Sequence, residues 1–162
     1  EVSVVGRYDM WLPGNQSINT FTGFLKPDPE ITLTIPSATD KAISVGAYDT
    51  STDKVASFSG RGFTRENNQI KPDIVAPGVN IRSAATGGGT TVLSGTSMAT
   101  PFVTGSAALM MEWGIVRGND PYLYGEKIKA YLIRGAKHLP GYEQWPNKQA
   151  GWGALCLRDS LV

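Results

Sequence analysis

The residues best suited to chemistry lie in one short segment, residues 94–101, with the sequence SGTSMATP. An uncharged run follows and predicts a helix, so Thr96 or Ser97 can act as its N-cap. A hydroxyl placed there lies near free backbone N–H groups and the positive end of the helix dipole, which favour a nucleophile whose reaction builds an oxyanion. Gly95 keeps the approach to Ser97 free of a side chain, and Pro101 falls near the first turn, where its missing N–H costs little. An ordinary cap on a core helix is the simpler interpretation, and a nucleophilic serine is the alternative.

Two helices are predicted in the second half of the chain. Residues 83–111 contain no charged side chain, and residues 98–113 have helical length and end before Gly114, a residue typical of helix ends. Because a helix that is apolar all round is a buried central helix, we expect residues 98–113 to be covered on every side. Residues 124–134 predict an amphipathic helix, with apolar side chains on one face and charged side chains on the other.

Short apolar runs bounded by turn residues predict strands at residues 42–48 and 74–76. Such runs are typical of strands that are covered on both faces. Strands that alternate with helices favour an α/β fold with a parallel sheet.

The beginning of the chain has a different pattern. Residues 2–12 predict a strand that ends in a turn. Residues 31–35, ITLTI, alternate apolar and hydroxyl side chains, which predicts a half-buried strand stopped by Pro36. We therefore predict a β-rich segment at residues 1–36 and a separate α/β unit at residues 37–162.

Composition excludes several classes of function. Fifteen basic and fourteen acidic side chains give a net charge of +1, so we expect no nucleic-acid partner, which would require clustered Lys and Arg. The longest apolar run, residues 107–111, is far shorter than the roughly 20 residues of a membrane span. The chain has one cysteine, Cys156, and one histidine, His138, and no Cys/His cluster with metal-ligand spacing. We therefore expect no metal site and no cofactor.

The segment GTSMATP at residues 95–101 resembles the serine motif of the subtilisin-like proteases, the subtilases. The resemblance extends over residues 37–162 in one order and with family-like spacing. It rests on four further blocks, which are AISVGAY at 42–48, VASFSG at 55–60, KPDIVAPGVN at 71–80 and AGWGAL at 150–155. It implies the C-terminal part of a subtilisin-like parallel-sheet fold, and a serine endopeptidase that hydrolyses peptide bonds through an acyl-enzyme.

The resemblance also implies roles for single residues. Ser97 would be the nucleophile that attacks the scissile carbonyl, and its backbone N–H would be one oxyanion donor. Ser94, Gly95 and Thr96 would line the substrate cleft beside the acyl group.

The other members of a catalytic triad are missing from their expected places. A serine nucleophile needs an adjacent base that is itself oriented by a third group, and in subtilases the chain order is Asp, His, Ser. No histidine precedes Ser97, and His138 follows it, so chain order argues against His138 as the base. Asn15 follows a glycine and is a candidate side-chain oxyanion donor, although turn-forming asparagines are commoner. Asp49, Asp53 and Asp73 also precede Ser97, but none of them lies in the family's Asp-Ser/Thr-Gly setting.

These departures lead us to expect that the chain is the C-terminal portion of a larger subtilase, with the aspartate and histidine upstream. Such a portion would be inactive alone, and its partners would be the upstream part and a peptide or protein substrate. Residues 1–36 are similar to the end of a β-sandwich that some clostridial-type subtilases, including spore-germination proteases, carry as an insert. The resemblance implies an extracytoplasmic, secreted or spore-associated location. One alternative is an inactive pseudoprotease that acts as a binding or regulatory module, and another is an adhesion or carbohydrate module in the β-rich segment.

Overall fold

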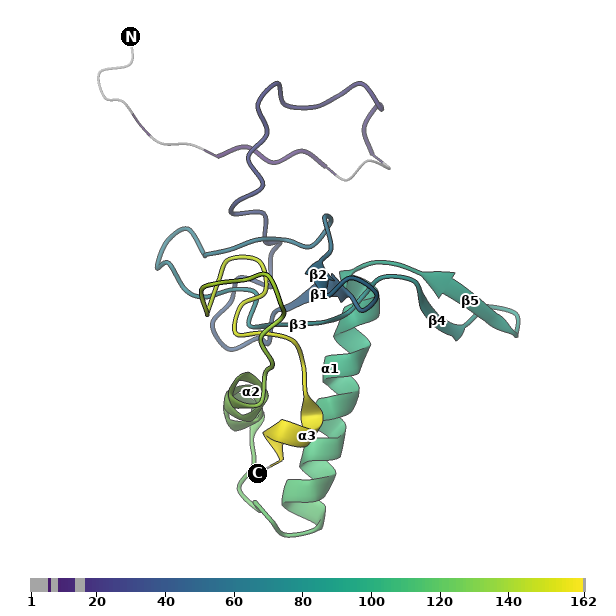
Figure 1. Cartoon of the computed structure of the whole chain (residues 1–162), viewed down its shortest axis with the longest axis vertical. Helices are drawn as coiled ribbons and strands as arrows, with labels where there is room; N and C mark the ends of the chain where they lie inside the picture. Colours follow the sequence, from purple (N-terminus) through teal and green to yellow (C-terminus); the bar gives the residue numbers. More distant parts are fainter. Residues whose placement is uncertain (1–5, 7–8, 14–16, 162) are drawn as a thin grey trace.

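The computed structural model describes residues 6, 9–13 and 17–161, and Figure 1 shows its elements. In chain order these are β1 (Val45–Asp49), β2 (Lys54–Val55), β3 (Ile74–Pro77), β4 (Ile81–Ala84), β5 (Thr90–Leu93), α1 (Thr96–Met111), the π-helical segment η1 (Glu112–Val116), α2 (Gly125–Arg134) and α3 (Leu157–Ser160).

The central sheet confirms the two strands predicted from apolar runs. Its order is β2-β1-β3, with β1 parallel to β3 and antiparallel to β2. The strand predicted at residues 42–48 begins at Val45 and ends at Asp49, and the one predicted at 74–76 is β3. Ile74, Val75 and Ala76 are 0% exposed, as expected for a strand covered on both faces. The mixed α/β class with parallel strands is therefore confirmed.

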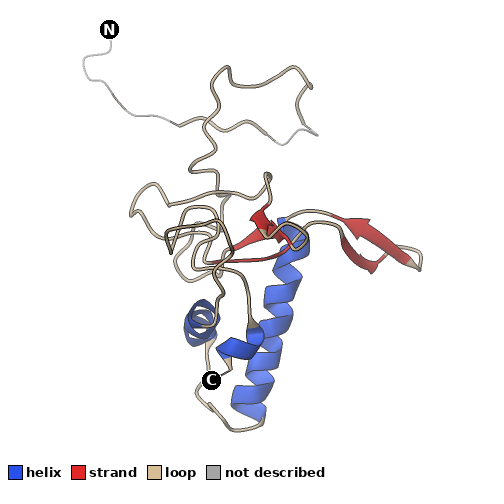
Figure 2. Cartoon of the chain, viewed as in Figure 1, coloured by secondary structure: helices blue, strands red, loops and turns tan. Residues whose placement is uncertain are grey.

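The last part of the chain extends this sheet beside β3. The N–H of Val75 donates to the carbonyl of Gly153 at 2.9 Å, and the N–H of Leu155 donates to the carbonyl of Val75 at 2.8 Å. In contrast, β4 and β5 form a separate antiparallel hairpin that projects away from the sheet (Figure 2). This hairpin leads directly into α1.

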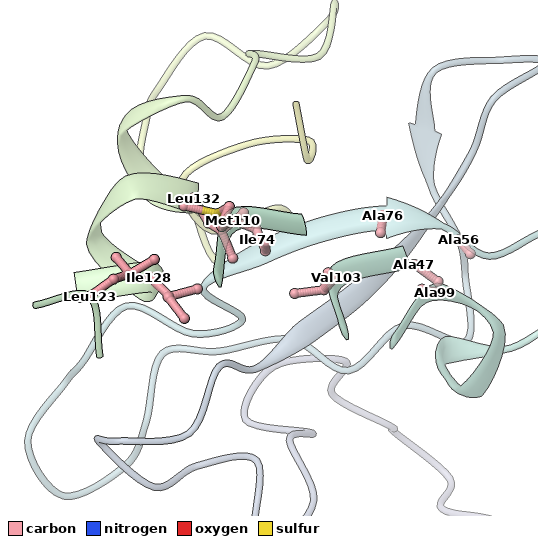
Figure 3. Packing of buried hydrophobic residues seen from close by; sticks show 10 residues of the cluster. All are labelled: Ala47, Ala56, Ile74, Ala76, Ala99, Val103, Met110, Leu123, Ile128 and Leu132. Carbon is pink, nitrogen blue, oxygen red and sulfur yellow. The ribbon is translucent and has the colours of Figure 1, made fainter. Parts of the chain in front are cut away.

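The core lies between the sheet and the helices. Figure 3 shows its ten buried hydrophobic residues, which come from the sheet, the loops beside it, α1 and α2. They are Ala47, Ala56, Ile74, Ala76, Ala99, Val103, Met110, Leu123, Ile128 and Leu132. The amphipathic helix predicted at residues 124–134 is confirmed as α2, whose buried residues are Ile128 and Leu132.

The prediction that the helix at residues 98–113 is covered on every side is wrong for the part of the chain that the structure describes. Ala99, Val103 and Met110 are buried on one face of α1. On the rest of the helix, Phe102 is 43% exposed and Leu109 is 53% exposed. An uncharged surface thus stays open because the sheet and α2 contact only one face.

The strand predicted at residues 31–35 is also wrong. No described residue before Val45 lies in a strand, and Ile35 is 92% exposed. Instead of pairing with a strand, Thr32 is bound to the loop at Arg61: its N–H donates to the Arg61 carbonyl, and its hydroxyl accepts from the Arg61 N–H, both at 2.9 Å. The strand predicted at residues 2–12 lies largely outside the described residues.

Asp120 stabilises the connection between η1 and α2, and the direction of its pKa shift predicts how stability depends on pH. Its carboxylate oxygens lie 2.6 Å from the Lys127 ammonium, and one accepts a hydrogen bond from the Tyr131 hydroxyl at 3.0 Å. The hydrogen bond from Lys127 is the largest cause that lowers the pKa of Asp120 below its ordinary value. A carboxyl with a lowered folded-state pKa adds stability above its unfolded pKa, and this is lost as the pH falls through the folded pKa.

We therefore expect Asp120→Asn to destabilise the protein at neutral pH and to reduce its loss of stability on acidification. Urea unfolding at a series of pH values measures both effects. Parallel stability curves for the two proteins would contradict the prediction.

Candidate active site

Ser97 is the second residue of α1 and is exposed to solvent. The N-cap is Gly95 and no side chain caps the helix, so the expectation that Thr96 or Ser97 is the N-cap is wrong. The Gly95 carbonyl takes the first bonds instead, from the N–H of Met98 at 3.0 Å and of Ala99 at 3.3 Å. Within the described part of the chain, the Ser97 hydroxyl makes no hydrogen bond, which leaves it available to a substrate.

The start of α1 is attached to the ends of the two parallel strands. The N–H of Gly78, just after β3, donates to the Tyr48 carbonyl of β1 at 3.0 Å. The Gly78 carbonyl in turn accepts from the N–H of Gly95 at 2.8 Å. A Cβ at Gly78 would lie 2.5 Å from the Cβ of Ala47, so only glycine fits between β1 and the turn before α1. The carboxyl ends of the strands therefore set the position of Ser97.

Ser94 supports the same turn from the hairpin side. Its hydroxyl oxygen accepts a hydrogen bond from the N–H of Asn80 at 2.8 Å, across the base of the β4–β5 hairpin. Ser94 itself is exposed. Because it lies at the surface, Ser94 can contact a substrate as predicted, and its hydroxyl also stabilises the turn.

The electrostatic field at Ser97 comes from the helix itself. The first N–H groups of a helix have no intrahelical partner. At α1 no side chain caps them, and the first turn contains no acidic residue. Two of these groups bond main-chain carbonyls, the Gly95 N–H to Gly78 and the Met98 N–H to Gly95. Among the described residues, the N–H groups of Thr96 and Ser97 have no such partner, and together with the positive end of the helix dipole they suit an oxyanion.

Pro101 lies deeper in α1 than expected. It is the sixth residue of the helix, beyond the first turn, so the expectation that its missing N–H costs little there is wrong. A proline inside a helix lacks the N–H that would bond the carbonyl four residues earlier. Here that carbonyl belongs to Ser97, and Pro101 therefore loosens the hydrogen bonding of the helix at the serine.

A cavity of about 670 Å³ lies beside the start of α1. Thr96 and Thr100 line it from the helix, and residues 42–46 and 57–61 line it from the sheet side. Thr96 is half-buried, and its carbonyl accepts a hydrogen bond from the Thr100 hydroxyl at 3.0 Å. Of the residues that the sequence predicts to line a cleft, Thr96 thus lies both at a cavity and next to Ser97.

The other candidate residues have local partners. The His138 ring stacks on Trp145 with centroids 4.4 Å apart and planes at 1°. The Asp49 carboxylate accepts hydrogen bonds from the hydroxyl and N–H of Ser51, and these lower the pKa of Asp49 below its ordinary value. Asp73 belongs to a buried cluster of charges. Among the described residues, none of these side chains bonds to Ser97. Asn15 lies outside the described residues.

In the described ranges, no three His, Cys, Asp or Glu side chains gather to hold a metal ion. None of the helices there is long and apolar enough to cross a membrane.

Comparisons with known proteins agree with this geometry. The model of the subtilase family, Peptidase_S8, matches residues 11–153. The chain therefore belongs to the subtilase family of serine proteases, and the resemblance to subtilases is confirmed.

Several relatives are similar over most of the chain. Serine protease AprX of Bacillus subtilis (strain 168) is 37% identical over 158 residues, which cover 83% of this chain and 33% of AprX. Membrane-bound transcription factor site-1 protease of Mus musculus is 34% identical over 131 residues, 78% of this chain and 12% of that protein. The structure of the Clostridium perfringens CspB protease matches with a TM-score of 0.82 and 49% identity, over 86% of this chain and 30% of that one. The chain thus spans a third or less of these relatives.

Proposed function

We propose that the full-length protein is a serine endopeptidase that hydrolyses peptide bonds through an acyl-enzyme on Ser97. One observation carries this proposal. The Ser97 hydroxyl is exposed and without a hydrogen bond, at an uncapped helix start that is attached to the ends of two parallel strands.

In this mechanism the Ser97 hydroxyl attacks the scissile carbonyl and its proton passes to a base. The oxygen of the tetrahedral intermediate accepts a hydrogen bond from the Ser97 N–H and lies in the field of the helix start. Ser94, Gly95 and Thr96 contact the acyl part of the substrate. The base and the group that orients it are a histidine and an aspartate upstream of this chain, because no histidine precedes Ser97.

The proposed upstream part also covers surfaces that are open in the described structure. The chain spans 33% of AprX and 30% of the CspB protease chain. On α1, Phe102, Leu109 and Met111 are 43%, 53% and 47% exposed. Burying such side chains is worth about 1.5–3 kcal/mol each, so we expect the upstream part to pack on this face.

We further propose that residues 1–36 are the end of a domain inserted before the unit at residues 37–162. Large hydrophobic side chains in this segment are almost fully exposed: Phe21 at 95%, Leu25 at 103% and Ile35 at 92%. Contiguous exposed hydrophobic side chains mark a surface that meets another part of a protein. We also propose that the protein acts outside the cytoplasm. Its association with spores stays a prediction from the resemblance.

The test is to expose the full-length protein, with its upstream sequence read from the gene, to a fluorophosphonate. We expect a covalent adduct on Ser97, located by peptide mass spectrometry. An intact upstream histidine combined with no adduct on Ser97 would defeat the proposal. Replacement of both upstream triad residues would favour the inactive binding or regulatory module instead.

Gly105 tests whether the upstream part packs on α1. A Cβ built at Gly105 meets nothing within 4 Å. If that space were open in the full-length protein, Gly105→Ala would stabilise it by about 1 kcal/mol through helix propensity. Because we propose that the space is filled, we expect Gly105→Ala to destabilise the full-length protein by about 1–3 kcal/mol through overpacking.

The sign of the change in the free energy of unfolding, measured with urea, decides between these cases. Gly125→Ala is the matched control, since Gly125 is exposed at the first position of α2 and its Cβ would also meet nothing within 4 Å. Stabilisation by both substitutions would mean that nothing covers this face.

A further inference from the structure

A buried cluster of three charged side chains lies where β1 and β3 begin, at the opposite end of the strands from Ser97. Asp73 directly precedes β3, and its side chain is 4% exposed. Its Oδ2 lies 2.8 Å from the Lys71 Nζ, and its Oδ1 lies 2.9 Å from the Nζ of Lys129 in α2. Oδ2 also accepts a hydrogen bond from the N–H of Ser44 at 2.7 Å. We call Lys71, Asp73 and Lys129 the Asp73 cluster.

The two lysines of the Asp73 cluster hold the chain that enters β1. The Lys71 Nζ donates to the Ala42 carbonyl at 2.8 Å, and the Lys129 Nζ donates to the Asp40 carbonyl at 2.8 Å. The N–H of Asp73 also donates to the Ser44 carbonyl at 2.8 Å. Three segments far apart in the sequence therefore meet at one carboxylate.

The ion pairs alone are a weak source of stability for the Asp73 cluster. One carboxylate faces two ammonium groups, and the Lys71 side chain is 1% exposed, so an excess positive charge lies away from water. Burial is the largest cause that lowers the pKa of Lys71 below the ordinary lysine value. Replacing buried ion clusters with apolar side chains of similar volume is often neutral or stabilising. What the cluster supplies, and apolar side chains cannot, is a set of directed hydrogen bonds to the main chain before β1.

The strands connect the Asp73 cluster to Ser97. β3 pairs with β1 over four positions, from Val45↔Ile74 to Tyr48↔Pro77. At the far end of this ladder, Gly78 bonds to Tyr48 and to Gly95. The position of β3 along β1 therefore sets the position of Gly95, two residues before Ser97.

We propose that Asp73, held by Lys71 and Lys129, is a positioning residue for Ser97. It fixes β3 along β1 at the start of the ladder, and the ladder places Gly78, Gly95 and the nucleophile at its end. The inference rests on the proposed function, since it assigns a reactive role to Ser97.

The test replaces the Asp73 cluster in the full-length protein with apolar side chains, as Lys71→Met, Asp73→Leu and Lys129→Met together. We expect a lower melting temperature, because the Ser44 N–H and the Ala42 carbonyl lose their partners, so labelling is compared at a temperature at which both proteins are folded. We expect the rate of fluorophosphonate labelling at Ser97 to fall about ten- to a hundredfold, since displacements near 1 Å have effects of that order. Hydrogen exchange at the Gly95 amide should become faster.

A second variant and a control complete the design. Lys129→Met alone leaves the neutral Lys71–Asp73 pair, and should give a smaller fall in labelling rate even if the triple variant does not fold. Lys41→Met is the matched control, because Lys41 joins the same chain segment to α2 through an exposed pair with Glu126, 3.7 Å apart. It should leave labelling and exchange unchanged.

The outcomes separate the two proposals. Folded variants with unchanged labelling and unchanged Gly95 exchange would overturn the positioning role. If the protein without substitutions does not label at Ser97, the proposed function fails. Faster hydrogen exchange at Gly95 in the variants would then still support the placement of the helix start by the Asp73 cluster.

Discussion

Ser97→Ala in the full-length protein is expected to lower the turnover of a peptide substrate by about 10⁶-fold, the loss found when a triad serine is removed from such an enzyme. The loss is this large because the Ser97 hydroxyl forms the acyl-enzyme in the proposed mechanism. The remaining helix-start N–H groups and substrate contacts would still leave some acceleration over water. Initial rates on a fluorogenic peptide measure the loss of turnover, and single-turnover labelling by a fluorophosphonate measures the loss of the reactive hydroxyl.

The fold should be unaffected by this substitution. Among the described residues the Ser97 hydroxyl has no hydrogen-bond partner, and the side chain is exposed, so we expect little change in the free energy of unfolding. Ser83→Ala makes the same chemical change at an exposed position of β4 and should leave turnover intact. Peptidase activity that survives Ser97→Ala but not the loss of another residue would place the nucleophile elsewhere.

The sequence predicts the parts of the fold that depend on local burial. Residues 74–76 are an apolar run that matches the burial of β3 on both faces. The amphipathic pattern of α2 matches its one core face, on which Ile128 and Leu132 are buried and Tyr131 and Ile133 are partly buried. In contrast, the alternation at residues 31–35 is a local pattern without a partner strand. The Thr32 hydroxyl, which suggested a polar strand face, bonds to the main chain of Arg61 instead.

The helix that carries Ser97 shows what an uncharged sequence can predict about burial. Its uncharged sequence predicts cover on all sides, yet only one face is buried by described residues. In the proposed full-length protein, the upstream part would supply the cover that the uncharged pattern predicts. The same difference motivates the proposal of an upstream part that packs on Phe102 and Leu109.

At the site, the sequence indicates the nucleophile but not its support. The role of Ser97 is proposed from its motif, whereas the cap at Gly95 depends on a carbonyl that no side-chain pattern reveals. Gly78 follows a proline and is typical of a turn between elements. Its close contact with Ala47, 30-odd residues earlier, arises only when β1 and β3 pair. Tertiary contacts of this kind leave no local signal in one sequence.

Gly78→Ala is expected to have the second largest effect, on both stability and reactivity. The added Cβ would lie 2.5 Å from the Ala47 Cβ and 3.0 Å from the Gly95 carbonyl oxygen. Neither neighbour can move freely, since Ala47 is 0% exposed within β1 and Gly95 is bonded to Gly78 itself. The main chain must shift, at a cost of about 3 kcal/mol in the free energy of unfolding.

The shift caused by Gly78→Ala moves the start of α1 and therefore Ser97. We expect fluorophosphonate labelling of the folded variant to slow by about a hundredfold, measured at a temperature well below its melting point. Gly125→Ala adds the same methyl group in open space, so it should not destabilise the protein and should leave the labelling rate unchanged. If Gly78→Ala were destabilised and yet labelled at the original rate, the contact would serve the sheet alone, and the position of Ser97 would have to be set by the hairpin contact between Ser94 and Asn80.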